Sequence, residues 1–133
     1  MKSDEQLLAE LRAAAEGLLF MSESDHPIEV VRWDGAQEIT HEFLRREAGK
    51  GADAPVEEAS AAQVFRAAAS EPAWKGAEEL RAARRYQTLV RLLEENLKGV
   101  TAYRVGAIDI RIFVVGRSRA GDWLGVATRA VET

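Results

Sequence analysis

The sequence contains no cysteine, only three prolines and only two histidines among its 133 residues. The absence of cysteine excludes disulfides, thiol catalysis and zinc or iron–sulfur sites built on cysteine. No apolar run approaches the roughly 18 residues that a transmembrane helix needs, and residues 2–5 do not resemble a secretory leader. We therefore expect a cytoplasmic chain with no membrane contact and with no metal or cofactor of its own.

Charge is distributed unevenly along the chain. Residues 1–60 carry 14 acidic and 6 basic side chains, whereas residues 61–133 carry 8 acidic and 12 basic ones. With a net charge of −4, this pattern favours a basic protein partner over direct binding of nucleic acid, because phosphates repel an acidic surface. An unevenly charged, merely solvated surface is the simpler alternative. The hydrophobic share of 47% suffices for one folded domain over residues 1–133.

Apolar residues at helical spacing predict four helices. Ser3 and Gln6 have the spacing of a capping box at the start of the first helix. Lys98 and Gly99 are typical of a helix end and are expected to close the last one. The predicted helices span residues 3–17, 37–47, 60–69 and 78–98.

β-branched and alternating segments predict five strands. They span residues 28–33, 56–58, 101–105, 107–115 and 123–131. A polar loop is expected before the first strand, because Pro27 disfavours helix in the residue before it. The fold class is therefore α+β, expected as a three-layer α/β/α sandwich with a mixed sheet. The C-terminal strands are expected to form an antiparallel meander.

The motifs of common enzyme classes are incomplete. Residues 49–51 lack the Ser or Thr and the preceding Gly of a phosphate-binding loop. His41 has no second histidine at the spacing of a zinc-protease helix, since that position is Arg45. Asp25 and His26 are adjacent, but no nucleophile is indicated beside them. We expect a protein that is not an enzyme.

Three features indicate a binding surface instead. Residues 22–25 place two serines, a glutamate and an aspartate directly after the apolar residues 18–21, so a charged tip follows a buried stem. Trp74 has small or polar neighbours, and its indole suits an interface about as well as a core. The last predicted strand ends at Val131, which gives Thr133 a defined position.

Several segments of the sequence also resemble a known protein family. The segment GLLFMSESDHPIEV, residues 17–30, is similar to the nuclease A inhibitor family of bacteria, as are residues 40–42, 53–55 and 131–133. The resemblance covers nearly the whole chain, and the nine residues GLLFMSESD are its most specific part. It implies an α/β/α sandwich that binds and blocks the active site of a nonspecific, Mg-dependent DNA/RNA endonuclease of the ββα-metal type.

The resemblance further implies roles for individual residues. The acidic loop and the last residue would enter the nuclease site, and Thr133 would reach the Mg ion held by the partner. Ala73 departs from the family pattern, in which an acid can precede the tryptophan. The partner-binding residues implied are Glu23, Trp74, Thr133, Ser22, Ser24 and Asp25. We expect a monomer that forms a heterodimer with the nuclease.

Two alternatives remain open at this stage. The chain could be an interaction module with the same fold and a different partner. Less readily, it could be a small-ligand domain in which Glu23, Asp25 and His26 line a pocket.

Overall fold

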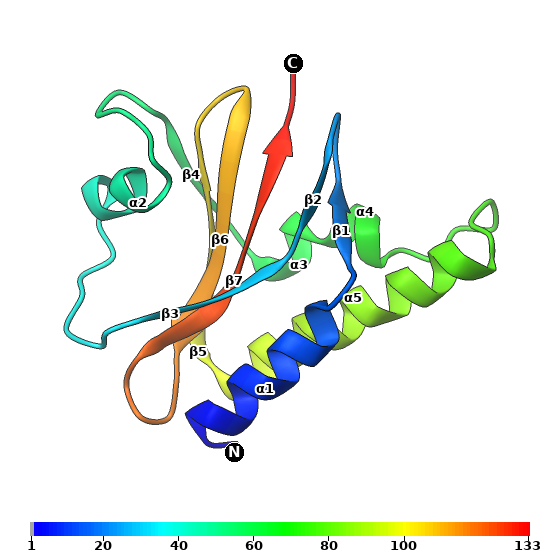
Figure 1. Cartoon of the computed structure of the whole chain (residues 1–133), viewed down its shortest axis with the longest axis horizontal. Helices are drawn as coiled ribbons and strands as arrows, with labels where there is room; N and C mark the ends of the chain where they lie inside the picture. The colour runs from blue at the N-terminus through cyan, green and yellow to red at the C-terminus, as the bar shows by residue number, and fades with distance from the viewer. Residues whose placement is uncertain (1) are drawn as a thin grey trace.

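The computed structural model describes residues 2–133, and its centre is a five-stranded sheet (Figure 1). The strands lie in the order β3-β7-β6-β5-β4, and every neighbouring pair is antiparallel. This arrangement confirms the α+β class and the C-terminal meander. The strands are β3 (Glu29–Trp33), β4 (Val56–Ala59), β5 (Lys98–Val105), β6 (Asp109–Arg117) and β7 (Trp123–Val131).

The prediction of a mixed sheet is wrong. β3 and β4 run in the same direction, but β7, β6 and β5 lie between them. The connection from β3 to β4 carries helix α2 (His41–Glu47) over one face of the sheet. Short turns keep the three strands of the meander together, so the two strands joined by the crossover are placed at opposite edges and never pair.

Helices cover both faces of the sheet, which confirms the three-layer sandwich. One face carries α1 (Asp4–Ala15) and α5 (Ala77–Asn96), while α2 lies on the other (Figure 1). The predicted helix at residues 60–69 is divided into α3 (Ala61–Val64) and α4 (Arg66–Ala69). The division falls at Phe65, whose side chain is fully buried.

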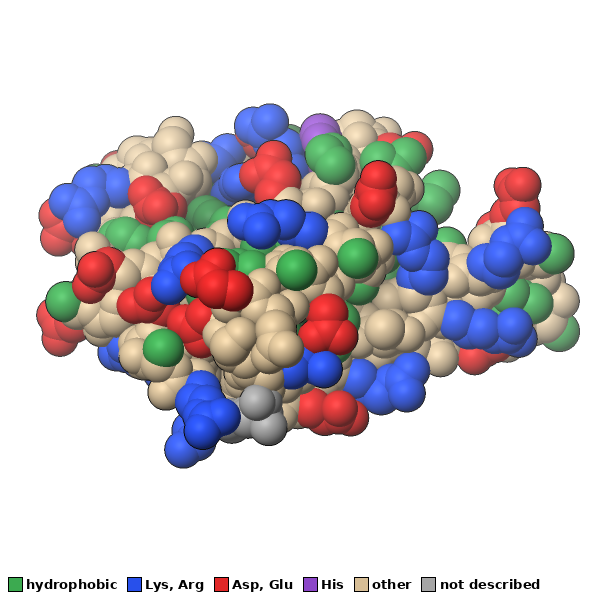
Figure 2. All heavy atoms as spheres, turned by 60° about the horizontal axis from the view of Figure 1, so that its bottom comes forward, with side chains coloured by type: hydrophobic (Ala, Val, Ile, Leu, Met, Phe, Trp, Pro, Cys, Tyr) green, Lys and Arg blue, Asp and Glu red, His purple; other side chains and the backbone are tan. Residues whose placement is uncertain are grey.

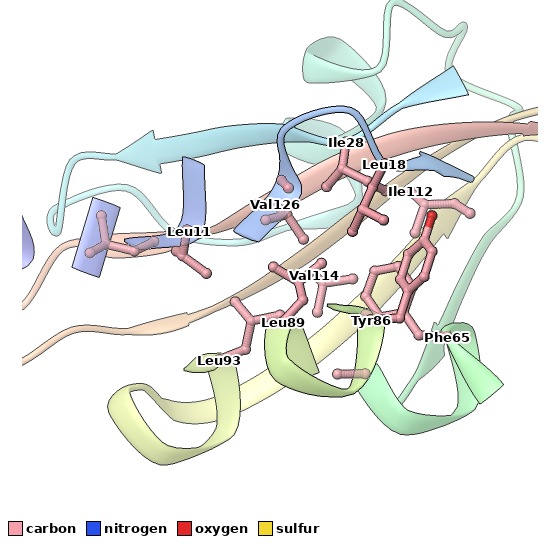
Figure 3. Close-up of a cluster of buried hydrophobic side chains, with 14 of the residues drawn as sticks. Leu11, Leu18, Ile28, Phe65, Tyr86, Leu89, Leu93, Ile112, Val114 and Val126 are labelled. Carbon is pink, nitrogen blue, oxygen red and sulfur yellow. The ribbon is translucent and has the colours of Figure 1, made fainter. Parts of the chain in front are cut away.

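The main core lies between the sheet and the helices α1 and α5. Figure 3 shows Leu89 and Leu93 of α5 facing Val114 and Val126 of the sheet, and all four are buried. Burial of one such side chain contributes about 1.5–3 kcal/mol. On the opposite face, Phe43 of α2 belongs to a second, smaller core.

Local signals placed three helix starts within one residue, but the start of α2 four residues too early and the end of α5 two residues too late. The predicted capping box between Ser3 and Gln6 is present. The predicted closure of the last helix at Lys98 and Gly99 is wrong, because both residues belong to β5. Gly99 has a φ of +62°, and the register of β5 against β6 shifts between Lys98 and Thr101. The glycine therefore serves a β-bulge rather than a helix end.

The prediction of a polar loop before β3 is also wrong. This segment forms a two-stranded antiparallel hairpin of β1 (Leu19–Met21) and β2 (Asp25–Pro27). Phe20 points inward and meets Phe65 edge to face, with the ring centroids 5.9 Å apart. Leu19 and Met21 are exposed. This alternation is that of a strand with only one buried face.

The acidic and basic halves of the sequence do not separate on the face shown in Figure 2, where acidic and basic side chains are interspersed. The strand order explains this mixing, since β3 of the acidic half pairs with β7 of the basic half. Glu29 of β3 forms an ion pair with Arg111 of β6 at 3.1 Å. The face shown in Figure 2 therefore has no separate acidic half.

Two aspartates should make the free energy of unfolding depend on pH in the acidic range. Hydrogen bonds from Arg32 and from the Gly35 N–H lower the pKa of Asp122, and Arg129 with Lys50 lowers that of Asp109. A lowered pKa adds stability above the unfolded value of about 4, and that stability is lost as the pH falls through the folded value. The free energy of unfolding, measured in urea, should fall below about pH 4.

The double variant Asp109→Asn/Asp122→Asn provides the control for this expectation. Its free energy of unfolding should be lower than that of the parent at pH 7, and the difference should shrink as the pH falls. If the free energies of unfolding of the two proteins differ by the same amount from pH 7 down to the acidic range, Asp109 and Asp122 do not cause the pH dependence.

Candidate functional site

The tip of the β1–β2 hairpin lies beside the end of β7, more than 100 residues away in the sequence. The Ser22 hydroxyl accepts a hydrogen bond from the Val131 N–H at 2.9 Å. The Glu23 N–H in turn donates to the Val131 carbonyl at 3.1 Å. In Figure 1 the hairpin tip and the C-terminal end of the chain reach the same end of the molecule.

The carboxylate of Glu23 is bonded to Thr133 through both of its oxygens. The Thr133 N–H donates to Oε2 at 2.6 Å, and the Thr133 hydroxyl donates to Oε1 at 2.7 Å. A carboxylate has about four lone-pair positions, so this pair leaves acceptor capacity on Glu23. The arrangement gathers several oxygen atoms on an exposed surface.

Glu132 lies between Val131 and Thr133 in the sequence and makes contacts of its own. Its N–H donates to the Ile108 carbonyl at 2.9 Å. Its carboxylate pairs with Arg104 of β5, with 2.8 Å between Nη2 and Oε2. Every residue from Val131 to Thr133 is thus tied to a neighbouring segment by at least one hydrogen bond.

The remaining polar residues of the hairpin form a separate pair. Ser24 Oγ lies 2.7 Å from His26 Nε2, and both side chains are partly buried. Asp25 is exposed and lies between them in the sequence. Among the hydrogen bonds of residues 2–133, none joins His26 to a carboxylate, so the third member of a hydrolytic triad is missing there.

A groove next to the hairpin collects exposed apolar side chains. Of the four large apolar side chains exposed among residues 2–133, three lie here: Leu19 (49% exposed), Met21 (76%) and Trp74 (75%). The groove has a volume of about 380 Å³ and runs between β1 and the helices α4 and α5. Because its side chain is so exposed, Trp74 is not a core residue.

The groove adjoins the cluster of Glu23 and Thr133. Phe20, Met21 and Val64 line both the groove and the shallow cleft that contains Glu23, Thr133 and Arg104. An apolar surface and an oxygen-rich surface therefore meet along β1. Such a combination is typical of protein interfaces, where aromatic anchors lie near polar groups.

Both sides of the groove are anchored to the fold. The Tyr86 hydroxyl of α5 donates to the Leu19 carbonyl at 2.7 Å, and burial raises the pKa of Tyr86 to about 12. Beside Trp74, Lys75 Nζ donates to the Ser70 carbonyl at 2.7 Å and to the carbonyls of Ala67 and Ala68. Lys75 thus contacts the end of α4, which fixes the loop that carries Trp74.

Comparison with known proteins found a matching family. A family model described as "Nuclease A inhibitor-like protein" matches residues 5–133. The chain belongs to the nuclease A inhibitor-like family. No match was found among curated protein sequences. The match spans nearly the whole chain, so it includes the hairpin, the Trp74 loop and the chain end.

The structure of this family member brings some of the predicted site residues together and leaves others apart. Ser22 and Glu23 form one hydrogen-bonded cluster with Val131 and Thr133, and Trp74 lines the neighbouring groove. Ser24 faces His26, and Asp25 is exposed without lining the groove.

Sequence reasoning missed Arg104 and Glu132, and also Leu19 and Met21. The alternation of Leu19, Phe20 and Met21 could have indicated a strand with an exposed apolar face. Arg104 lies in β5 and Glu132 follows β7, 28 residues away, so no local spacing signals their ion pair.

The described part of the chain offers neither a metal-binding cluster nor a membrane-spanning helix. Residues 2–133 contain no cluster of three or more His, Cys, Asp or Glu side chains that could hold a metal ion. No helix within residues 2–133 is long and apolar enough to cross a membrane.

Proposed function

We propose that this protein inhibits a nonspecific, Mg-dependent DNA/RNA endonuclease of the ββα-metal type by binding over its active site, without catalysing a reaction itself. One observation carries the proposal. The Glu23 carboxylate and the Thr133 hydroxyl are joined at an exposed edge, next to a groove with the exposed Trp74. Membership of the nuclease A inhibitor-like family supports it.

The chemistry of a nuclease site explains why these groups would bind there. Such a site holds a divalent cation and basic side chains that grip phosphates. Hard cations prefer oxygen ligands, and Glu23 with Thr133 presents oxygens in a fixed arrangement. We propose that Thr133 reaches the Mg ion of the partner and that Glu23 faces its cationic groups.

The remaining predicted residues would extend this contact. Trp74 and the exposed Met21 would cover an apolar patch of the nuclease, while Asp25 and Ser24 would lie at the polar rim. We propose a heterodimer of one inhibitor and one nuclease, formed by a free monomer.

A degradation assay tests this proposal. The purified protein is titrated into a ββα-metal endonuclease encoded in the same genome, with Mg²⁺ and plasmid DNA present. Cleavage should stop near one inhibitor per nuclease. The proposal fails if cleavage continues at its full rate with a large molar excess of the protein, and an interaction module with another partner would then be the better interpretation.

Trp74→Ala should separate binding from folding. Because the indole is exposed, its removal should change the free energy of unfolding by no more than about 0.5 kcal/mol. Affinity for the nuclease should fall by about tenfold or more, since exposed aromatics often anchor interfaces. Urea unfolding and titration calorimetry measure the two effects. A loss of roughly 3–5 kcal/mol in stability, as for a core aromatic, would contradict the assignment.

A further inference from the structure

The end of the chain is held by three side chains that come from two different elements. Ser22 of the hairpin accepts from the Val131 N–H, and Glu23 accepts from Thr133. Arg104 of β5 forms an ion pair with Glu132. These contacts fix Val131–Thr133 on an exposed surface, where a segment with few contacts would open locally at little cost in free energy.

Two of these side chains are directed toward the chain end rather than away from the molecule. The Ser22 hydroxyl accepts from the Val131 N–H and donates to the Ser24 carbonyl at 2.9 Å. The Arg104 side chain is only 25% exposed, and its guanidinium contacts the Glu132 carboxylate. Both groups are therefore engaged within the molecule at the positions where a partner would approach Thr133.

We propose that Ser22 and Arg104 are positioning residues, which hold residues 131–133 in the binding conformation before the nuclease arrives. The inference rests on the proposed function, in which Thr133 enters the nuclease site. A flexible chain end would lose conformational freedom on binding, and that loss weakens affinity. Residues that folding has already ordered do not lose this conformational freedom again when the nuclease binds. The free energy of their contacts with the nuclease is then not offset by a cost of ordering.

This mechanism differs measurably from direct contact with the nuclease. If Arg104 acts only through Glu132, then Arg104→Gln, Glu132→Gln and the double variant should weaken inhibition to a similar extent, about tenfold. Residues that act through one shared contact show such non-additive effects. If Arg104 instead touched the nuclease, its replacement would still weaken inhibition in the Glu132→Gln background.

The experiment combines the inhibition constant with a measurement on the free protein. The ¹⁵N heteronuclear NOE of the Glu132 and Thr133 amides reports their order on the picosecond to nanosecond timescale. Ser22→Ala and Arg104→Gln should lower this NOE and weaken inhibition, and Ser22→Thr, which keeps a hydroxyl, should restore both. Arg129→Gln is the matched control, since Arg129 of β7 pairs with Asp109 and not with the chain end.

The possible outcomes separate the two proposals. An NOE that falls without weaker inhibition, or inhibition that weakens without a fall in the NOE, would overturn the positioning role while the inhibitor function stands. A parent protein that fails to inhibit the nuclease would overturn the proposed function, and the positioning role with it. Unchanged chemical shifts of the core amides confirm that each variant is folded.

Discussion

Glu23→Gln is expected to weaken binding of the nuclease by on the order of 2 kcal/mol, or about 30-fold. The substitution keeps the shape of the side chain but removes the charge that would face cationic groups. It also replaces one acceptor oxygen by an NH₂ group, at a place where Thr133 presents two donors. The Thr133 hydroxyl can accept from this NH₂ group while the Thr133 N–H donates to the remaining oxygen, so both contacts can be kept and the loss of affinity reports the missing charge.

The stability of the fold should change little in this variant, because the Glu23 side chain is exposed. Titration calorimetry gives the affinity, and urea unfolding gives the stability. Glu47→Gln is a matched control, since it removes the same charge from α2 on the other face of the sheet. Equal affinities for Glu23→Gln and the parent protein would exclude Glu23 from the binding site.

The predictable parts of this fold are those whose signal is local. The capping residue Ser3 and the spacing of apolar residues placed α1 within about one turn of its observed end. The strand at Trp123–Val131 was predicted at its observed bounds, because turn residues at 116–121 precede it. Short turns between the last strands also made the meander predictable.

The parts that failed depend on contacts between distant residues. β1 and β2 have only three residues each, too few for a periodic signal, and they are stabilised by packing of Phe20 against Phe65. The order of β3 and β4 in the sheet depends on where α2 crosses, which no local pattern encodes. Gly99 has the same signature at a helix end and in a bulge, so tertiary pairing decided between the two.

The candidate site was predictable in its residue types and not in its connections. The run at residues 22–25 and the unusual position of Trp74 were visible in the sequence. That both carboxylate oxygens of Glu23 bind Thr133 follows only from the approach of the hairpin to β7. The position of this carboxylate makes the chain end the most sensitive part of the proposed interface.

Adding residues after Thr133 should therefore have the largest effect of all the changes considered. In a protein made to end at Thr133, the α-carboxylate is ionised at neutral pH, since its reference pKa is about 3.3–3.7. A C-terminal His tag converts it to an amide and adds bulk beside Glu23. We expect inhibition to weaken by at least about a hundredfold, or roughly 3 kcal/mol.

An N-terminal His tag is the control for this experiment, because the start of α1 lies at the opposite end of the molecule (Figure 1). It adds the same residues and should leave inhibition unchanged. Extra residues at an exposed end rarely disturb a fold, so both tagged forms should unfold at the same urea concentration. A generic interaction surface elsewhere on the molecule would tolerate both tags equally. Equal inhibition by the two forms would thus show that Thr133 does not enter the nuclease site, even if the protein is an inhibitor.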